Sequence, residues 1–466
     1  MTAPWDQRPT DEHARVAALT LSGWLPAVLA VSPYHRRRHG ERDERALGDL
    51  AGLRRLTPTR ERDLLADSPA GASAVLRPDA AQVKRFAGSD TLGGIARAIR
   101  TRGSDGARDA ILEAYRPVQL HRGGADGELL VASSRHDLDR LHRAGARAAA
   151  VLGLGDADVV VSAVPAGPTL ASFGSVHLAY GAGLTALHAR GADDDLAAVV
   201  RGADLLGATV LVVPLEGAVA LAAALADARV AADRVHTVVT SGPPPDDETR
   251  ARIADAFRAA LGRDVRVRAL WGPSAGRSLW AECAEGTHGL HTTPDLEVLE
   301  VLDPLTGAPT DGDGDLTITS IGWHGTAHVR FQTGTWVDPP TTEPCPGCAR
   351  TVPRLVGDVV PHAWELPADV GDGATATVDL RGVAAVLADV PGVERWRAEL
   401  RGPSDRVARD RLLVEVAGRP PAAQLDGLAT RIGRAVGLEP QLLPDIPAAE
   451  IDLAVAELGG VLADRR

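Results

Sequence analysis

Residues 208–240 read A-T-V-L-V-V-P-L-E-G-A-V-A-L-A-A-A-L-A-D-A-R-V-A-A-D-R-V-H-T-V-V-T, and this stretch decides the fold class. Its two ends, 208–213 and 235–240, are short runs rich in valine that predict buried β-strands. Alanine and leucine, both good helix formers, dominate residues 218–230 between them. A strand, a helix and a second strand of this kind predict parallel strands joined by a helical crossover.

The same alternation extends along the chain on both sides of this stretch. The expected elements are a helix at 137–152, a strand at 158–164, a helix at 246–261 and a strand at 265–270. Acidic residues in the first turn of the helix at 246–261 complement its dipole. Together these segments predict a layered α/β domain. Residues 10–66 precede it with a helical pattern that is broken at Ser32-Pro33.

Beyond Trp271 the pattern changes to short strands and turns. Strands are expected at 297–302, 315–320 and 326–331, with turn glycines at 307 and within 311–314. The later elements are a helix at 381–388, strands at 396–401 and 411–416, a helix at 422–436, a strand at 440–443 and a last helix ending at 462. Their order is that of a small α+β domain. We therefore predict a large domain over residues 1–366, a hinge rich in Gly, Asp and Ala at 367–375, and a C-terminal domain over 376–466.

The composition bounds the class of protein. The 466 residues carry a net charge of −12, which argues against a nucleic-acid partner because phosphate neutralisation dominates such binding. The basic run at 35–39 is interpreted as a solvated helix end. The longest N-terminal apolar stretch, 17–31, is shorter than a membrane span and lacks a basic start, so no membrane association is expected. Three cysteines without a disulfide pattern fit a reducing compartment, and we expect a cytoplasmic protein. The sequence leaves the oligomeric state open, with a homodimer as one candidate.

All three cysteines of the chain fit one metal site together with a histidine. Residues 282–291 read E-C-A-E-G-T-H-G-L-H, and residues 344–348 read P-C-P-G-C. A C-x-x-C turn presents two thiolates, and a distant cysteine with one imidazole completes the ligand set of structural zinc. We predict zinc bound within 283–348 by Cys283, His291, Cys345 and Cys348, with His288 as an alternative fourth ligand. Four protein ligands leave no position for an activated water, so the predicted role is structural.

Further motifs follow one another in a recognisable order. They are W-G-P-S at 271–274, D-P-L-T-G at 303–307, R-F-Q-T-G at 330–334 and P-C-P-G-C at 344–348. In this order the chain resembles the phenylacetate–CoA ligase branch of the adenylate-forming (AMP-dependent synthetase and ligase) superfamily. The resemblance implies an α/β chain with the adenylate-forming-enzyme fold: a large layered α/β N-terminal domain with a β-rich part, and a small α+β C-terminal domain. It also implies a reaction in which a carboxylate attacks the α-phosphate of ATP and coenzyme A then displaces AMP.

The residues that would handle ATP in such an enzyme are largely replaced. The family's S-S-G-T-T-G-K phosphate loop corresponds to residues 121–127, where two glycines remain but the four hydroxyls and the lysine do not. Asp126 in this loop would repel a triphosphate. Ala275 stands where the family has an acid that helps to hold magnesium, and Thr335 stands where the family has an aspartate that binds the ribose hydroxyls. The only lysine of the chain is Lys84, so the C-terminal lysine of the family has no counterpart.

Little of a nucleotide site therefore remains. The family's hinge motif G-R-x-D-D reads G-D-V-V-P at 357–361, without the arginine or the paired acids. Losing one transition-state contact typically costs roughly 10²–10³ in rate, and here several are lost together. We expect adenylation to be lost and ATP, magnesium and coenzyme A to be doubtful cofactors, and we assign no catalytic residue. The remnants of the nucleotide site are Gly123, Gly124, Trp271, Gly272, Ser274, Arg330 and Thr333.

Three functions are compatible with this sequence. The first is a divergent ligase-like protein of a biosynthetic pathway that binds an aryl or acyl substrate, or its thioester, without using ATP. The second is a working AMP-forming aryl- or acyl-CoA ligase with substituted active-site residues. The third is a non-catalytic partner subunit of a synthetase. His324 and His328 have helical spacing in a region of strands and turns, so they are not expected to form a metal pair.

Overall fold

The computed structural model of the chain describes residues 4–39, 49–79, 100, 109, 112–124, 127–189, 196–228, 232–303, 306–361, 365–371, 374–403, 409–458 and 462–465. The chain divides into two compact units. The large unit comprises Met1–Val301 and Pro309–Val360, and the small unit comprises Leu302–Ala308 and Pro361–Arg466. Asp126 and Lys84, on which two of the sequence predictions rest, lie outside the described residues.

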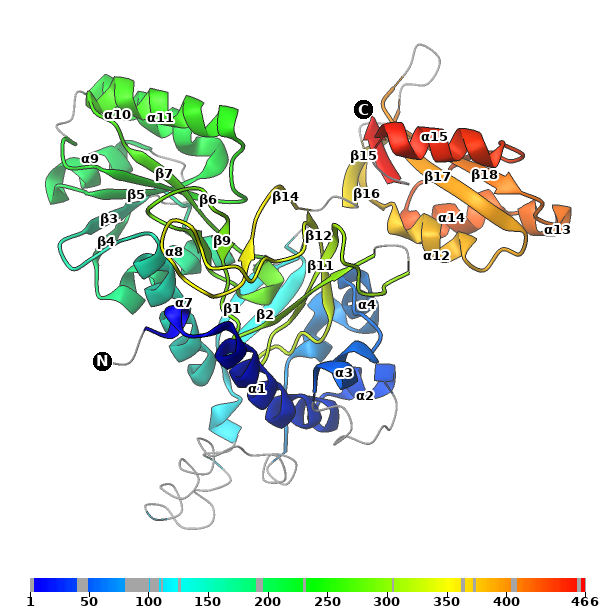
Figure 1. Cartoon of the computed structure of the whole chain (residues 1–466), viewed down its shortest axis with the longest axis horizontal. Helices are drawn as coiled ribbons and strands as arrows, with labels where there is room; N and C mark the ends of the chain where they lie inside the picture. The colour runs from blue at the N-terminus through cyan, green and yellow to red at the C-terminus, as the bar shows by residue number, and fades with distance from the viewer. Residues whose placement is uncertain are drawn as a thin grey trace. The chain divides into compact units, whose positions relative to one another are not determined.

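The large unit contains an eight-stranded sheet with the strand order β13-β9-β8-β7-β6-β5-β3-β4, and Figure 1 labels its strands β3 to β7. Its parallel part consists of β3 (Val159–Ser162), β4 (Thr185–His188), β5 (Val210–Pro214), β6 (Thr237–Ser241) and β7 (Arg266–Trp271). An antiparallel extension follows with β8 (Trp280–Glu282), β9 (Leu290–His291) and β13 (Arg354–Leu355). The expected parallel strands are therefore confirmed to within a few residues.

Helices cover both faces of this sheet, and α9 to α11, in green in Figure 1, all lie on one of them. Alternate residues of β5 face opposite layers because successive strand side chains point to opposite sides. Leu211 and Val213 pack with residues of α9 (Leu196–Leu206), α10 (Ala218–Ala228) and α11 (Asp247–Leu261). Val210 and Val212 pack with residues of α7 (Arg135–Val151) and α8 (Leu170–Ala182). The layered α/β architecture expected from the sequence is thus confirmed.

Shorter elements build the rest of the large unit. A second sheet contains β10 (Val298–Leu302), β11 (Gly314–Thr319), β12 (Phe331–Val337) and β14 (Val359–Val360), and β1 (Pro117–Gly123) pairs with β2 (Leu129–Ser134). The strand predicted at 326–331 is wrong, since β12 begins at Phe331. Arg330 just before it has a left-handed φ of 46°, which interrupts an extended chain. The N-terminal helices are α1 (Thr10–Val31), α2 (Pro33–His39), α3 (Leu50–Arg54) and α4 (Glu61–Asp67), with the expected break at Ser32.

Helix α1 is longer than the apolar stretch identified in the sequence. It spans 22 residues and is, among the described helices, the one with the length and composition to cross a membrane. Its buried face, however, contributes Leu21, Leu25 and Val28 to a cluster with Ile321 and Val329 of the large unit. This packing is typical of a core helix.

The small unit contains the sheet β19-β18-β17-β20 and a separate hairpin. Its strands are β17 (Val393–Arg401), β18 (Arg411–Gly418), β19 (Gln441–Leu443) and β20 (Leu462–Arg465), and its helices are α12 (Arg381–Leu387), α13 (Ala422–Leu425), α14 (Leu428–Val436) and α15 (Ala448–Leu458). The residues predicted as a hinge, 367–375, lie mostly in the hairpin of β15 (Glu365–Gly371) and β16 (Ala374–Asp379), where Thr375, Thr377 and Val378 favour a strand. The last helix ends at Leu458 instead of 462, because Leu462 begins β20 beside β17.

Candidate metal centre and nucleotide-site remnants

Four side chains with metal-binding atoms come together beside the antiparallel part of the large sheet. Cys283 follows β8, His291 lies in β9, and Cys345 and Cys348 lie in the turn that precedes β13. Their sulfur and nitrogen atoms all lie within 4.8 Å of one another. β9 places them, since Ala281 of β8 pairs with His291 on one side and Arg354 of β13 on the other. The four ligands predicted from the sequence therefore form one cluster.

The distances within this cluster match a tetrahedral metal site. Cys283 Sγ lies 3.8 Å from Cys345 Sγ, and Cys348 Sγ lies 3.3 Å from His291 Nε2. Zinc–sulfur bonds of about 2.3 Å at tetrahedral angles separate two sulfurs by roughly 3.8 Å, whereas a disulfide would need about 2.05 Å. All three thiols are free. The donor set and its spacing fit a metal bound by three thiolates and one imidazole.

His291 has the tautomer and charge that metal binding requires. Its Nδ1 lies 3.3 Å from the Ala281 carbonyl oxygen, which can only accept, so Nδ1 carries the hydrogen and Nε2 offers a lone pair. Burial lowers the pKa of His291 to about 4 despite this hydrogen bond. The imidazole is consequently neutral at pH 7 and available as a ligand.

The surroundings of Cys283 and Cys345 shift their thiol pKa values in opposite directions. Burial, together with the neighbouring Cys348 and Cys345, raises the pKa of the Cys283 thiol to about 12. Burial acts in the same sense on Cys345, but the backbone N–H groups of Cys348 and Gly347 outweigh it and lower the pKa of the Cys345 thiol. Without a cation, one thiol of this cluster is thus held protonated. A divalent cation would reverse that preference because a coordinating thiol is deprotonated.

His288, the alternative fourth ligand, lies beside the cluster instead of within it. A side chain at Gly347 would meet the His288 ring at 2.8 Å, which places His288 against the C-x-x-C turn. Its ring is not among the four ligand groups that lie within 4.8 Å of one another. Because Leu290 of β9 packs in the opposite core cluster, the alternation of the strand directs His291 toward the thiols.

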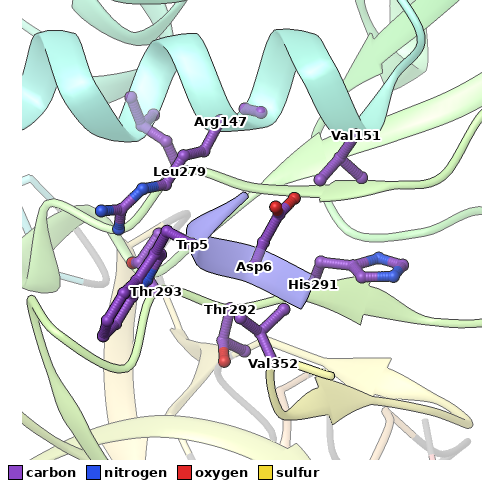
Figure 2. A pocket seen from close by; sticks show the side chains of 10 residues that line it. Trp5, Asp6, Arg147, Val151, Leu279, His291, Thr292, Thr293 and Val352 are labelled. Atoms are coloured by element: carbon purple, nitrogen blue, oxygen red, sulfur yellow. The ribbon is translucent and has the colours of Figure 1, made fainter. Parts of the chain in front are cut away.

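A small cavity adjoins the metal cluster on the side of His291. It holds about 10 Å³, enough for roughly one water molecule. Figure 2 shows Trp5 and Asp6, from a short 3₁₀ helix at Trp5–Gln7, next to Arg147 of α7 and the strand that carries His291. Trp5 lines this cavity, and its buried Nε1 has no hydrogen-bond partner among the residues that the structure describes, so a bound water would satisfy it.

The loop that corresponds to the family's phosphate loop is closed by contacts within the protein. The Gly124 N–H donates to Ser274 Oγ at 3.1 Å, and the Ser274 carbonyl lies 2.9 Å from His121 Nε2. A Cβ on Gly124 would lie 2.0 Å from a carboxylate oxygen of Glu61, and one on Gly123 would meet the backbone of Ala275 at 3.2 Å. A negatively charged side chain therefore lies against the backbone that would have to bind phosphate. Nothing in the sequence pattern indicated that Glu61 would lie here.

Ala275, which aligns with a magnesium-binding acid of the resembled family, lies in an apolar environment. Ala275 is buried in a cluster with Tyr34, Leu64, Leu129 and Phe331. An ionised carboxylate at this position would lose its hydration among hydrophobic side chains, which is costly without a paired charge. The substitution by alanine is therefore part of the core packing.

The Arg330 side chain is buried in the core and pairs with Glu300 there. Its Nε and Nη2 donate to the Glu300 carboxylate at 3.0 and 3.2 Å, and its Nη1 donates to the carbonyls of Arg54 and Leu56. Both charged side chains are almost completely buried. The position resembles a nucleotide-binding arginine in sequence, but its guanidinium is satisfied by a buried ion pair.

The other predicted remnants also have local roles. Thr333 Oγ1 donates to the Leu316 carbonyl at 2.8 Å, and the half-buried ring of Trp271 packs edge-on against Trp280 with centroids 5.7 Å apart. A side chain on Gly272 would meet the Ser278 carbonyl oxygen at 2.2 Å. His324 stacks on His136 and Tyr115, whereas His328 packs against Phe331.

Comparisons with known proteins identify the fold. No protein-family model and no curated protein matches the sequence. Among solved structures, the chain is similar to 2-hydroxyisobutyryl-CoA ligase in its postadenylation state, with 18% identity over 97% of this chain and 93% of that chain and a TM-score of 0.61. It is also similar to the same enzyme in its thioesterification state, with 17% identity over 100% of this chain and 94% of that chain and a TM-score of 0.59. The chain thus has the adenylate-forming ligase fold.

Proposed function

We propose that this protein is a divergent ligase-like protein that binds an aryl or acyl substrate, or its thioester, and no longer adenylates carboxylates. The contact of Glu61 with Gly124 carries this proposal. A carboxylate against the loop backbone opposes a triphosphate by charge, and Ser274 already accepts the N–H that a phosphate would need. The buried ion pair of Arg330 and the apolar surroundings of Ala275 support the same conclusion.

A working AMP-forming aryl- or acyl-CoA ligase is the second candidate. The similarity in fold to 2-hydroxyisobutyryl-CoA ligase extends over nearly the whole of both chains. In this candidate, nucleotide contacts other than those of the family would support both adenylation and thioester formation. Arg122, on the exposed side of β1, would then replace the missing lysine of the phosphate loop.

ATP–pyrophosphate exchange with a panel of aryl and acyl carboxylates separates the two candidates. The proposal expects no exchange above background, and no rise in melting temperature with ATP or AMP. The same thermal assay with aryl- and acyl-CoA thioesters should show a rise that free coenzyme A does not produce. Robust exchange with any acid would favour the second candidate. No rise in melting temperature with any thioester would contradict the proposed binding of thioesters.

We also propose that the cluster of Cys283, His291, Cys345 and Cys348 binds a structural zinc ion. The tetrahedral spacing of its donors and the neutral His291 support this assignment. Elemental analysis of protein purified without added metal should find close to one zinc per chain. Metal-free protein that is fully folded and unaffected by added zinc would contradict it.

A further inference from the structure

The segment 4–8 at the start of the chain packs directly on the residues that follow the metal cluster. The Thr351 N–H donates to the Asp6 carbonyl at 2.9 Å, and Thr351 Oγ1 also donates to the Asp6 and Arg8 carbonyls. The Asp6 carboxylate forms an ion pair with Arg350. These two side chains are 344 positions apart in the sequence and nearly buried where they meet.

Trp5 fixes this segment to α7. Its ring packs edge-on against His13 at 4.7 Å, and the guanidinium of Arg147 lies 5.6 Å from the ring centroid. Arg147 is itself held by Asp295 at 2.5 Å. Figure 2 shows Asp6 between α7 and the strand of His291. The segment is therefore positioned by contacts that do not involve the thiols.

Arg350 connects Asp6 to the metal cluster. Its guanidinium donates to the Asp6 carboxylate and to the Ala150 carbonyl. Burial lowers the pKa of Arg350, but the nearby Cys348 sulfur and Asp6 carboxylate outweigh burial and raise it. Its own carbonyl accepts from the Cys345 N–H at 2.8 Å, which closes the C-x-x-C turn. Arg350 thus contacts Cys345 through its backbone, and its guanidinium lies near Cys348.

The positive charge of Arg350 is what would affect metal binding. Three thiolates exceed the charge of one divalent cation, so a bound zinc site here would have excess negative charge on sulfur. A guanidinium near Cys348 would balance that charge, and its ion pair with Asp6 restricts the orientation of the guanidinium. Outer residues that orient metal ligands typically change metal affinity by about 10–100-fold when they are altered.

We propose that Asp6 and Arg350 are positioning residues of the metal centre, so that the segment 4–8 sets how tightly the metal is held. This inference rests on the proposed zinc site and adds to it residues that do not ligate the metal. Neither residue was identified from the sequence, because no motif links position 6 to position 350.

Competition with a chromophoric zinc chelator tests the inference on the full-length protein. Asp6→Asn and Arg350→Lys should each bind zinc about tenfold more weakly than the wild type. Lysine keeps the charge but lacks the planar fork that binds the Asp6 carboxylate and the Ala150 carbonyl together. Glu12→Gln is the matched control, because it removes the Arg8–Glu12 pair near the same segment without reaching the metal cluster, and it should bind zinc like the wild type.

Melting temperatures measured with zinc and after chelation distinguish a positioning role from a merely structural ion pair. The destabilisation by Asp6→Asn should be larger with zinc than in the metal-free protein. Equal destabilisation in both states, or zinc affinity equal to that of Glu12→Gln, would overturn the inference while the metal site stands. Absence of zinc from the wild-type protein would instead overturn the metal site itself.

Discussion

Replacing Arg330 with methionine removes the positive charge from a buried ion pair and leaves the Glu300 carboxylate without its guanidinium partner. The two carboxylate contacts, at 3.0 and 3.2 Å, lie where both side chains are almost fully buried. Two charges about 4 Å apart interact by roughly 4 kcal/mol at an effective dielectric constant of 20. Breaking one partner of such a pair typically costs about 3–5 kcal/mol, and the carbonyls of Arg54 and Leu56 lose a donor as well. We expect a destabilisation of that size for Arg330→Met.

Urea-induced unfolding followed by circular dichroism measures this effect. Arg54→Met is the matched control, since Arg54 lies 3.7 Å from the same carboxylate but is half exposed, and its loss should cost less than about 1 kcal/mol. If Arg330→Met were as stable as Arg54→Met, the buried ion pair would not have the structural role assigned to it. A variant of wild-type stability that lost a nucleotide-induced rise in melting temperature would instead identify Arg330 as a nucleotide-binding residue.

Three further outcomes are expected. Gly181→Ala should destabilise the packing of α7 on α8 by more than about 1 kcal/mol, because its Cβ would lie 2.1 Å from the His142 carbonyl oxygen. Gly155→Ala is the control and should be nearly neutral, because the space around Gly155 is open. Equal urea midpoints for the two variants would contradict this expectation. Burial lowers the pKa of His121 to about 4, so between pH 6.5 and 4 the unfolded protein binds a proton at this residue and the folded protein does not. The free energy of unfolding should therefore fall as the pH drops through this range. His121→Gln should reduce the slope by about 1.4 kcal/mol per pH unit, and an unchanged slope would refute the assignment. Cys345→Ser should lower both zinc content and melting temperature, and a variant that kept its full zinc content would exclude Cys345 as a ligand.

Local sequence features determined much of the architecture. Valine-rich runs alternating with alanine- and leucine-rich segments predicted the parallel strands and their helices, since burial on both faces selects such residues. The order of the motifs from W-G-P-S to P-C-P-G-C predicted the ligase fold. The same local reasoning misplaced β12 by several residues and did not predict that residues 367–375 contribute to the β15–β16 hairpin, because glycine and aspartate are common to turns and to linkers.

Residue types and spacing also predicted which side chains would gather at the metal cluster, because three cysteines offer few alternatives. Only the tertiary structure decided between His288 and His291, since the direction of a ring depends on which face of β9 it occupies. It likewise decided that Arg330 pairs with Glu300, that Glu61 lies against Gly124 and that Asp6 meets Arg350. These contacts join residues far apart in the chain, so no local propensity encodes them. They exist because the packed sheets and helices bring the segments together.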